Sequence, residues 1–174
     1  MFDAKYITER IRPIPDYPKK GILFRDITPL LKDPKGFGMC IDELAARLEG
    51  KRVDYVVGIE ARGFIIAPLL AYKMGKGFVP IRKKGKLPGA TISKEYEKEY
   101  GRDAMEMHRD ALERGSSVVI IDDLLATGDT ARAAAELVSE LGAKVSAIAF
   151  IIELSELRGR ERLKGYDVIS LVKY

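Results

Sequence analysis

The sequence has little of several residue types, and each scarcity argues against a class of site. The single cysteine, Cys40, excludes an intramolecular disulfide and favours a reducing compartment. The single histidine, His108, lies on an expected edge strand, so we expect neither a Ser–His–acid triad nor a Cys/His metal cluster. No apolar run reaches the ~18–20 residues of a membrane span, and the N-terminus lacks the apolar core of a signal peptide. We therefore expect a cytoplasmic protein without a membrane segment.

Two nucleotide-binding motifs are also missing. There is no GxxxxGK[ST] loop, which argues against a Walker-type nucleotide hydrolase, and no GxGxxG follows an expected strand, which argues against dinucleotide binding. Thirty Lys and Arg against 26 Asp and Glu give a net charge of +4, an excess that suits anionic small molecules or nucleic acid without deciding between them. The 174 residues, 47% of them hydrophobic, predict one globular domain with a full core.

Apolar segments alternate with helix-forming segments along most of the chain. We expect strands at 53–59, 78–81, 118–121, 145–152 and 168–172, and helices at 3–11, 34–48, 64–74, 130–141 and 156–163. Met105 and Met107 alternate with polar residues and predict an added edge strand. This order predicts an α/β fold with a mostly parallel central sheet flanked by helices, in which ligands bind beyond the carboxyl ends of the strands.

Three segments do not fit this alternation. Residues 12–33 contain four prolines and Gly21, so we expect an irregular stretch of the kind that usually has a function. Residues 85–101 are polar and predict a loop. Pro68 falls inside the helix expected at 64–74, which should therefore start later or kink.

The most informative segment is 117–130. An apolar run ends in Asp122 and Asp123, a turn of small and hydroxyl residues follows, and a helix begins near Thr130. The free N–H groups at a helix N-terminus can hold a phosphate. The two carboxylates would repel a phosphate and instead suit hydroxyl groups or a metal ion. Together these features predict a sugar-phosphate site.

Each feature alone also fits a structural role. The acid pair could be a solvated strand end, Arg62 a surface ion pair, and residues 82–86 a solvated charged turn. Glu99 could lie on the surface and Phe24 in the core, and packing roles are favoured for His108, Cys40 and the two methionines 105 and 107.

Residues 118–130 (Val-Val-Ile-Ile-Asp-Asp-Leu-Leu-Ala-Thr-Gly-Asp-Thr) resemble the 5-phosphoribosyl-1-pyrophosphate (PRPP) signature of type I phosphoribosyltransferases. Further segments resemble the adenine-specific branch of that family in order and spacing, and they cover most of the chain: 18–29 (Pro-Lys-Lys-Gly-Ile-Leu-Phe-Arg-Asp-Ile-Thr-Pro), 60–64 (Glu-Ala-Arg-Gly-Phe), 81–89 (Ile-Arg-Lys-Lys-Gly-Lys-Leu-Pro-Gly) and 99–101 (Glu-Tyr-Gly).

The resemblance implies a single-domain type I phosphoribosyltransferase fold over residues 1–174, with a small N-terminal hood over the base at 1–33 and a mobile lid loop at about 84–101. It implies purine salvage by the reaction adenine + PRPP → AMP + pyrophosphate. It also implies Mg²⁺ carried mainly by PRPP, with no assigned protein ligand to the metal, and a homodimer.

The resemblance further implies a role for each site residue. The turn that would hold the 5′-phosphate consists of Ala126, Thr127, Gly128, Asp129 and Thr130. Asp122 and Asp123 would accept hydrogen bonds from the ribose hydroxyls. Pyrophosphate would be held by Arg62, Lys86 and Arg82, the last reaching PRPP in the partner subunit.

The base would lie between Phe24 and Leu124, with backbone groups of Leu23 and Arg25 at its edge. Glu99 would assist proton transfer at the base, and Tyr100 would line the pyrophosphate side. Asp129 departs from the family's usual glycine. An aspartate tolerates a positive φ less well than glycine, and its charge repels a phosphate unless it points outward or caps the helix.

Two rival functions remain open. A sister enzyme could use xanthine, hypoxanthine or guanine, and it would differ in the hood. A non-catalytic PRPP-sensing regulator would keep the acid pair and the turn but bind nucleic acid through a basic face. No recognition-helix module is evident and Glu99 is retained, so we expect small-molecule substrates and neither a nucleic-acid nor a membrane partner.

Overall fold

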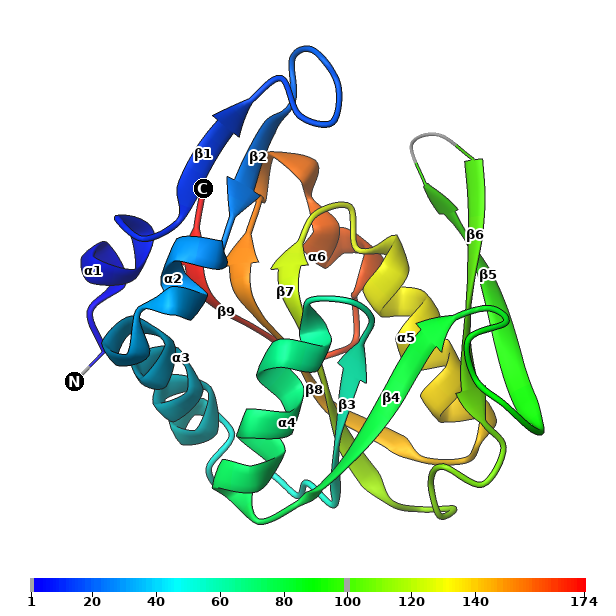
Figure 1. Ribbon diagram of the computed structural model, residues 1–174. Coiled ribbons are helices and arrows are strands. Elements are labelled where there is room, and N and C mark those ends of the chain that lie inside the picture. Colours follow the sequence, from blue (N-terminus) through cyan, green and yellow to red (C-terminus); the bar gives the residue numbers. More distant parts are fainter. Residues whose placement is uncertain (1, 99–100) are drawn as a thin grey trace.

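The computed structural model describes residues 2–98 and 101–174 (Figure 1). The strands are β1 (Arg12–Pro15), β2 (Leu23–Asp26), β3 (Tyr55–Ile59), β4 (Gly77–Lys83), β5 (Thr91–Lys98), β6 (Gly101–His108), β7 (Ser117–Leu125), β8 (Lys144–Glu153) and β9 (Val168–Lys173). The helices are α1 (Ala4–Thr8), α2 (Thr28–Lys32), α3 (Pro34–Arg47), α4 (Gly63–Met74), α5 (Asp129–Glu140), the 3₁₀ turn η1 (Ser155–Leu157) and α6 (Gly159–Arg162).

Seven strands form the central sheet in the order β5-β6-β4-β3-β7-β8-β9. The five strands from β4 to β9 in this order are parallel, and β6 and β5 continue the sheet antiparallel to β4. The expected fold class, a mostly parallel sheet flanked by helices, is confirmed. The run of β-branched residues explains the buried strands, because such side chains pack well on both faces of a pleated sheet.

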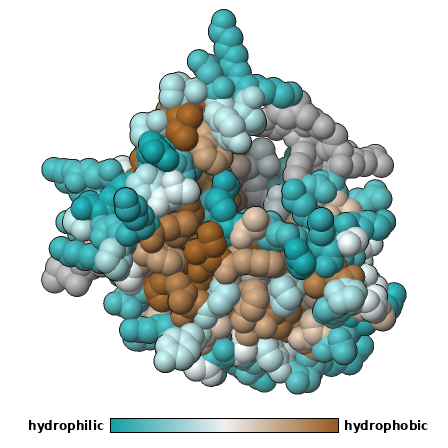
Figure 2. Space-filling model, in the orientation of Figure 1, coloured by the Kyte–Doolittle hydropathy of each residue, from teal (hydrophilic) through white to brown (hydrophobic). Residues whose placement is uncertain are grey.

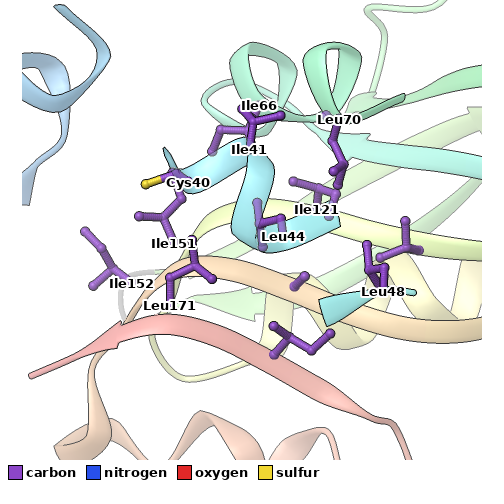
Figure 3. Packing of buried hydrophobic residues seen from close by; sticks show 14 of the residues in the cluster. Cys40, Ile41, Leu44, Leu48, Ile66, Leu70, Ile121, Ile151, Ile152 and Leu171 are labelled. Carbon is purple, nitrogen blue, oxygen red and sulfur yellow. The ribbon is translucent and has the colours of Figure 1, made fainter. Parts of the chain in front are cut away.

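Two apolar cores lie on opposite faces of the sheet. On β7, Val119 and Ile121 belong to the core beneath α3 and α4, while Val118 and Ile120 belong to the core beneath α5. Figure 3 shows side chains of α3 and α4 meeting those of β7, β8 and β9 in the first core. The dense packing on both faces fixes the strand ends relative to one another, which a site built on those ends requires.

The N-terminal segment is more regular than its composition predicts. Within residues 12–33 the chain forms the antiparallel pair β1–β2, followed by α2. The prolines at 13 and 15 are compatible with β1 because this two-stranded sheet leaves one edge of each strand unpaired. Arg12 donates to Asp26 at 2.6 Å across the pair. The guanidinium of Arg25 lies 3.8 Å from the ring centroid of Tyr174, which ties β2 to the end of β9.

The segment expected as a loop at 85–101 also contains a strand, β5, so the prediction of a loop is wrong for residues 91–98. Charged residues between Ile92 and Tyr96 hide the two-residue alternation of this strand. Because β5 pairs with β6, β5 takes the outer position, and β6, expected at the edge, lies between β5 and β4. The helix α4 begins at Gly63 and runs through Pro68, so it does not start later as one alternative held.

The carboxyl ends of the parallel strands meet at one rim of the sheet. In Figure 1 this rim lies between the β1–β2 pair and the β5–β6 hairpin, with the β7–α5 connection between them. The connections after β3, β4, β7 and β8 open there, and Tyr174 lies there just after β9. In the described part of the chain, no helix is long and apolar enough to cross a membrane.

Candidate active site

The predicted phosphate turn joins β7 to α5. The strand β7 continues through the acid pair to Leu125, four residues beyond its expected end, so the acids belong to the strand itself. The turn is therefore short, and α5 begins at Asp129, with Gly128 as its N-cap at φ +88°. A cavity of about 200 Å³ opens here, lined by Arg62, Asp122, Asp123, Leu124, Leu125, Ala126, Thr127, Gly128, Thr130, Ala131 and Phe150.

Two glycines bring the backbone of α6 against this turn. A Cβ on Gly128 would lie 2.5 Å from the carbonyl oxygen of Gly159, and a Cβ on Gly159 would lie 2.7 Å from Leu125 Cδ1 and would also collide with the carbonyl oxygen of Ala126. Only glycine allows this approach, and Gly128 also supplies the positive φ that the turn needs. The shape of the turn is therefore set by backbone packing.

The unusual aspartate does not line the cavity. Asp129 is the first residue of α5, where the helix dipole favours a negative charge. Its Oδ1 lies 3.7 Å from Nη1 of Arg162 on α6. Gly128 takes the positive φ, and Asp129 does not. The two conflicts expected of an aspartate here, a strained φ and a carboxylate facing the phosphate, are therefore both absent.

The acid pair faces the cavity in contact with one cation. Asp123 is only 3% exposed, and its Oδ2 lies 2.5 Å from Nε of Arg62. The backbone N–H of Asp123 donates to Oδ1 of Asp122 at 2.9 Å. Burial, and secondarily the charge of Asp123, raise the pKa of Asp122 well above its usual range. Two carboxylates at one strand end are well placed to accept hydrogen bonds from neighbouring hydroxyls.

Of the other predicted pyrophosphate residues, Arg82 lies near the end of β4 and Lys86 lies in the connection that follows it. Nη2 of Arg82 donates to Oε1 of Glu60 at 2.8 Å, and Nη1 donates to the carbonyl oxygen of Lys86 at 3.0 Å. The hydrogen bond from Arg82 lowers the pKa of Glu60, so this carboxylate is ionised at neutral pH. Neither Arg82 nor Lys86 lines the cavity beside the turn. The structure thus joins Arg62 directly to the acid pair, whereas Arg82 is bonded to Glu60 and to the backbone of Lys86.

All four predicted base-contacting residues line a second cavity, of about 710 Å³. They are Leu23, Phe24 and Arg25 of β2 and Leu124 of β7. The guanidinium of Arg62 lies 5.3 Å from the ring centroid of Phe24. The cavity has further walls that sequence reasoning missed: Leu154, Glu156, Leu157 and Tyr174. Leu154 and Tyr174 directly follow β8 and β9, and their position after buried strands was the available signal.

Glu99 and Tyr100, the predicted catalytic residues, lie outside the described residues. In the described ranges no group of three His, Cys, Asp or Glu side chains is arranged to hold a metal ion. The two carboxylates at 122 and 123 are hard oxygen donors that suit Mg²⁺ shared with a phosphorylated substrate. A protein-only metal cage is therefore not the arrangement that these residues favour.

Comparison with known proteins adds independent information. Residues 31–173 match the family model described as "Phosphoribosyl transferase domain". An adenine phosphoribosyltransferase of Caldanaerobacter subterraneus subsp. tengcongensis is 56% identical over 97% of both chains. The crystal structure of the adenine phosphoribosyltransferase of Thermoanaerobacter pseudethanolicus is 55% identical, with a TM-score of 0.97, over 99% of this chain and 100% of that one.

A Saccharomyces cerevisiae adenine phosphoribosyltransferase is also similar, at 42% identity and a TM-score of 0.94, over 97% of this chain and 98% of that one. That enzyme was crystallised with adenine and D-2,5-dideoxy-2,5-imino-altritol 1,6-bisphosphate. The similarity extends over nearly the whole of each chain, the hood segment included.

Proposed function

The chain belongs to the phosphoribosyltransferase family, among the adenine phosphoribosyltransferases, and we propose that its two cavities are the adenine and PRPP sites. The enzyme transfers the 5-phosphoribosyl group of PRPP to N9 of adenine and gives AMP and pyrophosphate, a step of purine salvage. One observation supports this assignment of the cavities most strongly. The larger, mostly apolar cavity and the smaller one beside the acid pair share the walls Leu124, Ala126, Thr127 and Thr130, so one nucleotide can extend through both.

In this proposal the turn at 126–130 holds the 5′-phosphate through backbone N–H and hydroxyl groups, helped by the α5 dipole. Asp122 and Asp123 accept hydrogen bonds from the ribose hydroxyls. Their negative potential lies close to the ring when the C1–O bond breaks and positive charge develops on the sugar. Arg62, Arg82 and Lys86 receive the departing pyrophosphate. Mg²⁺ carried by PRPP would add charge neutralisation to the leaving group.

The base is held by the hood. Phe24 stacks on the purine, and Tyr17 supports it with an edge-on contact at a centroid distance of 5.2 Å. Leu124 packs on the opposite face, and backbone groups of Leu23 and Arg25 meet the edge of adenine. A base with a misplaced donor leaves a buried group unpaired at a cost of ~1–3 kcal/mol. Glu99 takes up the proton that the base must lose, and the lid limits access of water to the sugar cation.

We also propose that a second copy of the chain covers α4. Ile65, Leu69 and Tyr72 follow one face of this helix and are 42%, 45% and 88% exposed. Figure 2 shows hydrophobic surface gathered over this region. Such a contiguous patch marks an interface, and a homodimer would let Arg82 approach the partner's PRPP. Sedimentation of the wild type should give a dimer, and Leu69→Asp should give a folded monomer. A wild type that sediments as a monomer would refute this part.

The reaction is tested by supplying PRPP, Mg²⁺ and, separately, adenine, hypoxanthine, guanine, xanthine or orotate, with products separated by chromatography. We expect AMP from adenine and no nucleotide from the other bases. A nucleotide from another purine would indicate the sister enzyme. No product from any base, together with a shift of labelled DNA or RNA, would indicate a regulator.

A further inference from the structure

The strand β6 carries a buried carboxylate that has no place in the mechanism above. Glu106 is 4% exposed. Its Oε1 accepts hydrogen bonds from the backbone N–H groups of Lys86, at 2.9 Å, and Leu87, at 2.7 Å. Its Oε2 accepts from Oγ1 of Thr91 at 3.4 Å. Because a buried charge without partners is strongly destabilising, these donors account for its position.

The two backbone partners of Glu106 lie in the turn that leaves β4, and Thr91 is the first residue of β5, which follows that turn. The hydrogen bond from Leu87 leads those that lower the pKa of Glu106, despite the opposing effect of burial. The carboxylate is therefore ionised at neutral pH, and hydrogen bonds to an ionised acceptor are about twice as strong as neutral ones. Glu106 thus holds the backbone at Lys86 in one conformation.

This turn is also bonded to Arg82. Arg82 lies opposite Glu106 in the register of β4 and β6. Lys86 donates its backbone N–H to Glu106, and its carbonyl oxygen accepts a hydrogen bond from Nη1 of Arg82 at 3.0 Å. Arg82 in turn binds Glu60, two residues before Arg62. A continuous chain of hydrogen bonds therefore runs from Glu106 in the β5–β6 hairpin to Glu60, in the connection that carries Arg62.

We propose that Glu106 is a positioning residue for pyrophosphate, which holds the turn so that Lys86 and Arg82 face the leaving group. This inference rests on the proposed function of those two cations. A competing effect has the opposite sign, since a negative charge near the site repels pyrophosphate. Positioning dominates here because the Glu106 charge is already balanced by two backbone N–H groups and the neighbouring Arg82.

The test compares Glu106→Gln with Glu106→Asp in the full-length enzyme. The amide keeps the size but loses the charge and one acceptor oxygen, whereas the aspartate keeps the charge. Asp110→Asn is the matched control, because it makes the same chemical change at an exposed acid just after β6. The measurements are kcat, KM for PRPP and for adenine, inhibition constants of pyrophosphate and AMP, and the melting temperature.

For Glu106→Gln we expect KM for PRPP and the inhibition constant of pyrophosphate to rise about tenfold, the loss of one hydrogen bond to a charged group. KM for adenine and the inhibition constant of AMP should change less than about twofold, because neither ligand reaches the turn. Glu106→Asp should recover part of the loss, and Asp110→Asn should match the wild type.

Three results would overturn the proposal. One is tighter pyrophosphate binding by Glu106→Gln, which would show that repulsion dominates. The second is an equal loss for pyrophosphate and AMP, which would show general destabilisation. The third is unchanged kinetics with a lowered melting temperature, which would show a purely structural role. In each case a wild type that makes AMP from adenine leaves the proposed function intact, so the two failures are distinguishable.

Discussion

The proposed phosphate and pyrophosphate ends of the site are built by different means. At the phosphate end, the turn after β7 is shaped by backbone contact between Gly128 and Gly159 and by the start of α5. At the pyrophosphate end, the cations are side chains that acids already hold: Arg62 lies 2.5 Å from Asp123, and Arg82 lies 2.8 Å from Glu60. One end offers fixed donors, and the other offers charges that can change partner.

The difference fits what each anion does in the reaction. The 5′-phosphate keeps its bonds throughout and becomes part of AMP, so a rigid turn serves it without reorganisation. Pyrophosphate gains charge as the C1–O bond breaks and must then leave. Arg62 and Arg82 are 40% and 33% exposed at their side chains, so solvent screens these ion pairs and limits their strength. Cations held in this way can move to a more highly charged partner.

The largest effect is expected at the exchangeable end. Arg62→Ala removes a cation that we propose binds pyrophosphate, and it leaves the buried carboxylate of Asp123 without its ion pair. We expect kcat/KM for PRPP to fall roughly 10²–10³-fold, since a guanidinium can make two hydrogen bonds to the charged leaving group, each contributing about 1.5–3 kcal/mol. Steady-state kinetics at varied PRPP measure this. Arg62→Lys should recover a minority of the loss, and a decrease below about tenfold would contradict the assigned role.

The rigid end is tested next, by Gly159→Ala. The added Cβ meets Leu125 Cδ1 at 2.7 Å and collides with the carbonyl of Ala126, so the turn must move. We expect activity to fall about a hundredfold, because a displacement of about 1 Å near a reacting group can cost that much. Overpacking should also lower stability by about 1–3 kcal/mol.

Gly38→Ala is the control for this substitution. Gly38 lies in α3, and a Cβ there would meet nothing within 4 Å. Alanine in a helix interior should raise stability by about 0.5–1 kcal/mol and leave activity unchanged. If Gly159→Ala and Gly38→Ala are equally active, backbone packing does not set the phosphate turn.

Substitution of Asp122, in the acid pair between the two ends, is expected to raise stability and to lower activity. The raised pKa of Asp122 means that the folded protein binds this proton more tightly than the unfolded chain. The contribution of Asp122 to the stability of the folded protein is therefore greatest below the pKa that Asp122 has in the unfolded chain. This contribution declines as the pH rises toward the raised pKa that Asp122 has in the folded protein. Asp122→Asn removes that decline. At pH 8 we expect the variant to melt roughly 2–4 °C above the wild type, equivalent to about 1 kcal/mol.

The same variant should be about tenfold less active at saturating adenine, because an amide is a weaker acceptor for the ribose hydroxyls than a carboxylate. The melting difference should shrink toward zero near pH 3, below the unfolded pKa of about 3.9, where Asp122 is mostly protonated in both states. A melting difference that stays constant between pH 3 and pH 8 would show that ionisation of Asp122 is not its source.

The contrast between the two ends also marks what the sequence alone could predict. The buried strands and the helix expected at 34–48 followed from local pattern and were confirmed. Asp33 caps this helix by accepting a hydrogen bond from the N–H of Lys35 at 3.1 Å. The phosphate turn has a local signature, because strand, turn and helix N-terminus are consecutive. Leu23, Phe24, Arg25 and Leu124 were placed together by resemblance, and the structure gathers them around one cavity.

The features of the fold and site that could not be predicted from the sequence depend on contacts between distant segments. Gly159 approaches a turn some thirty residues earlier, and nothing around it in the sequence indicates that contact. Leu154 and Tyr174 border the base cavity only because β8 lies beside β7 in the sheet and β9 lies beside β8. The strand β5 was missed because its charged residues obscure the alternation. Its partner β6 was expected from the alternation around Met105 and Met107, but its place between β5 and β4 depends on the sheet register.

The smallest effect is expected for Arg162, which among the described ion pairs is the one partner of Asp129. This pair is 60% and 24% exposed at its two side chains, so Arg162→Gln should raise KM for PRPP only about two- to fivefold. Arg158→Gln is the matched control, since Arg158 lies just before α6 and approaches only Glu161, at 4.0 Å, among the described ion pairs.

Arg162→Gln can be combined with Asp129→Gly to isolate the contribution of this ion pair. If Arg162 acts by holding the Asp129 carboxylate away from the phosphate, its removal should have no effect in an Asp129→Gly background, because the charge it balances is gone. If Arg162 instead attracts PRPP directly, Arg162→Gln should cost the same in both backgrounds. A double-mutant cycle on KM for PRPP at low and high ionic strength separates these outcomes. If Arg162→Gln raises KM for PRPP equally in both backgrounds, a side-chain charge also binds substrate at the phosphate end. The contrast between the two ends of the site would then be weaker.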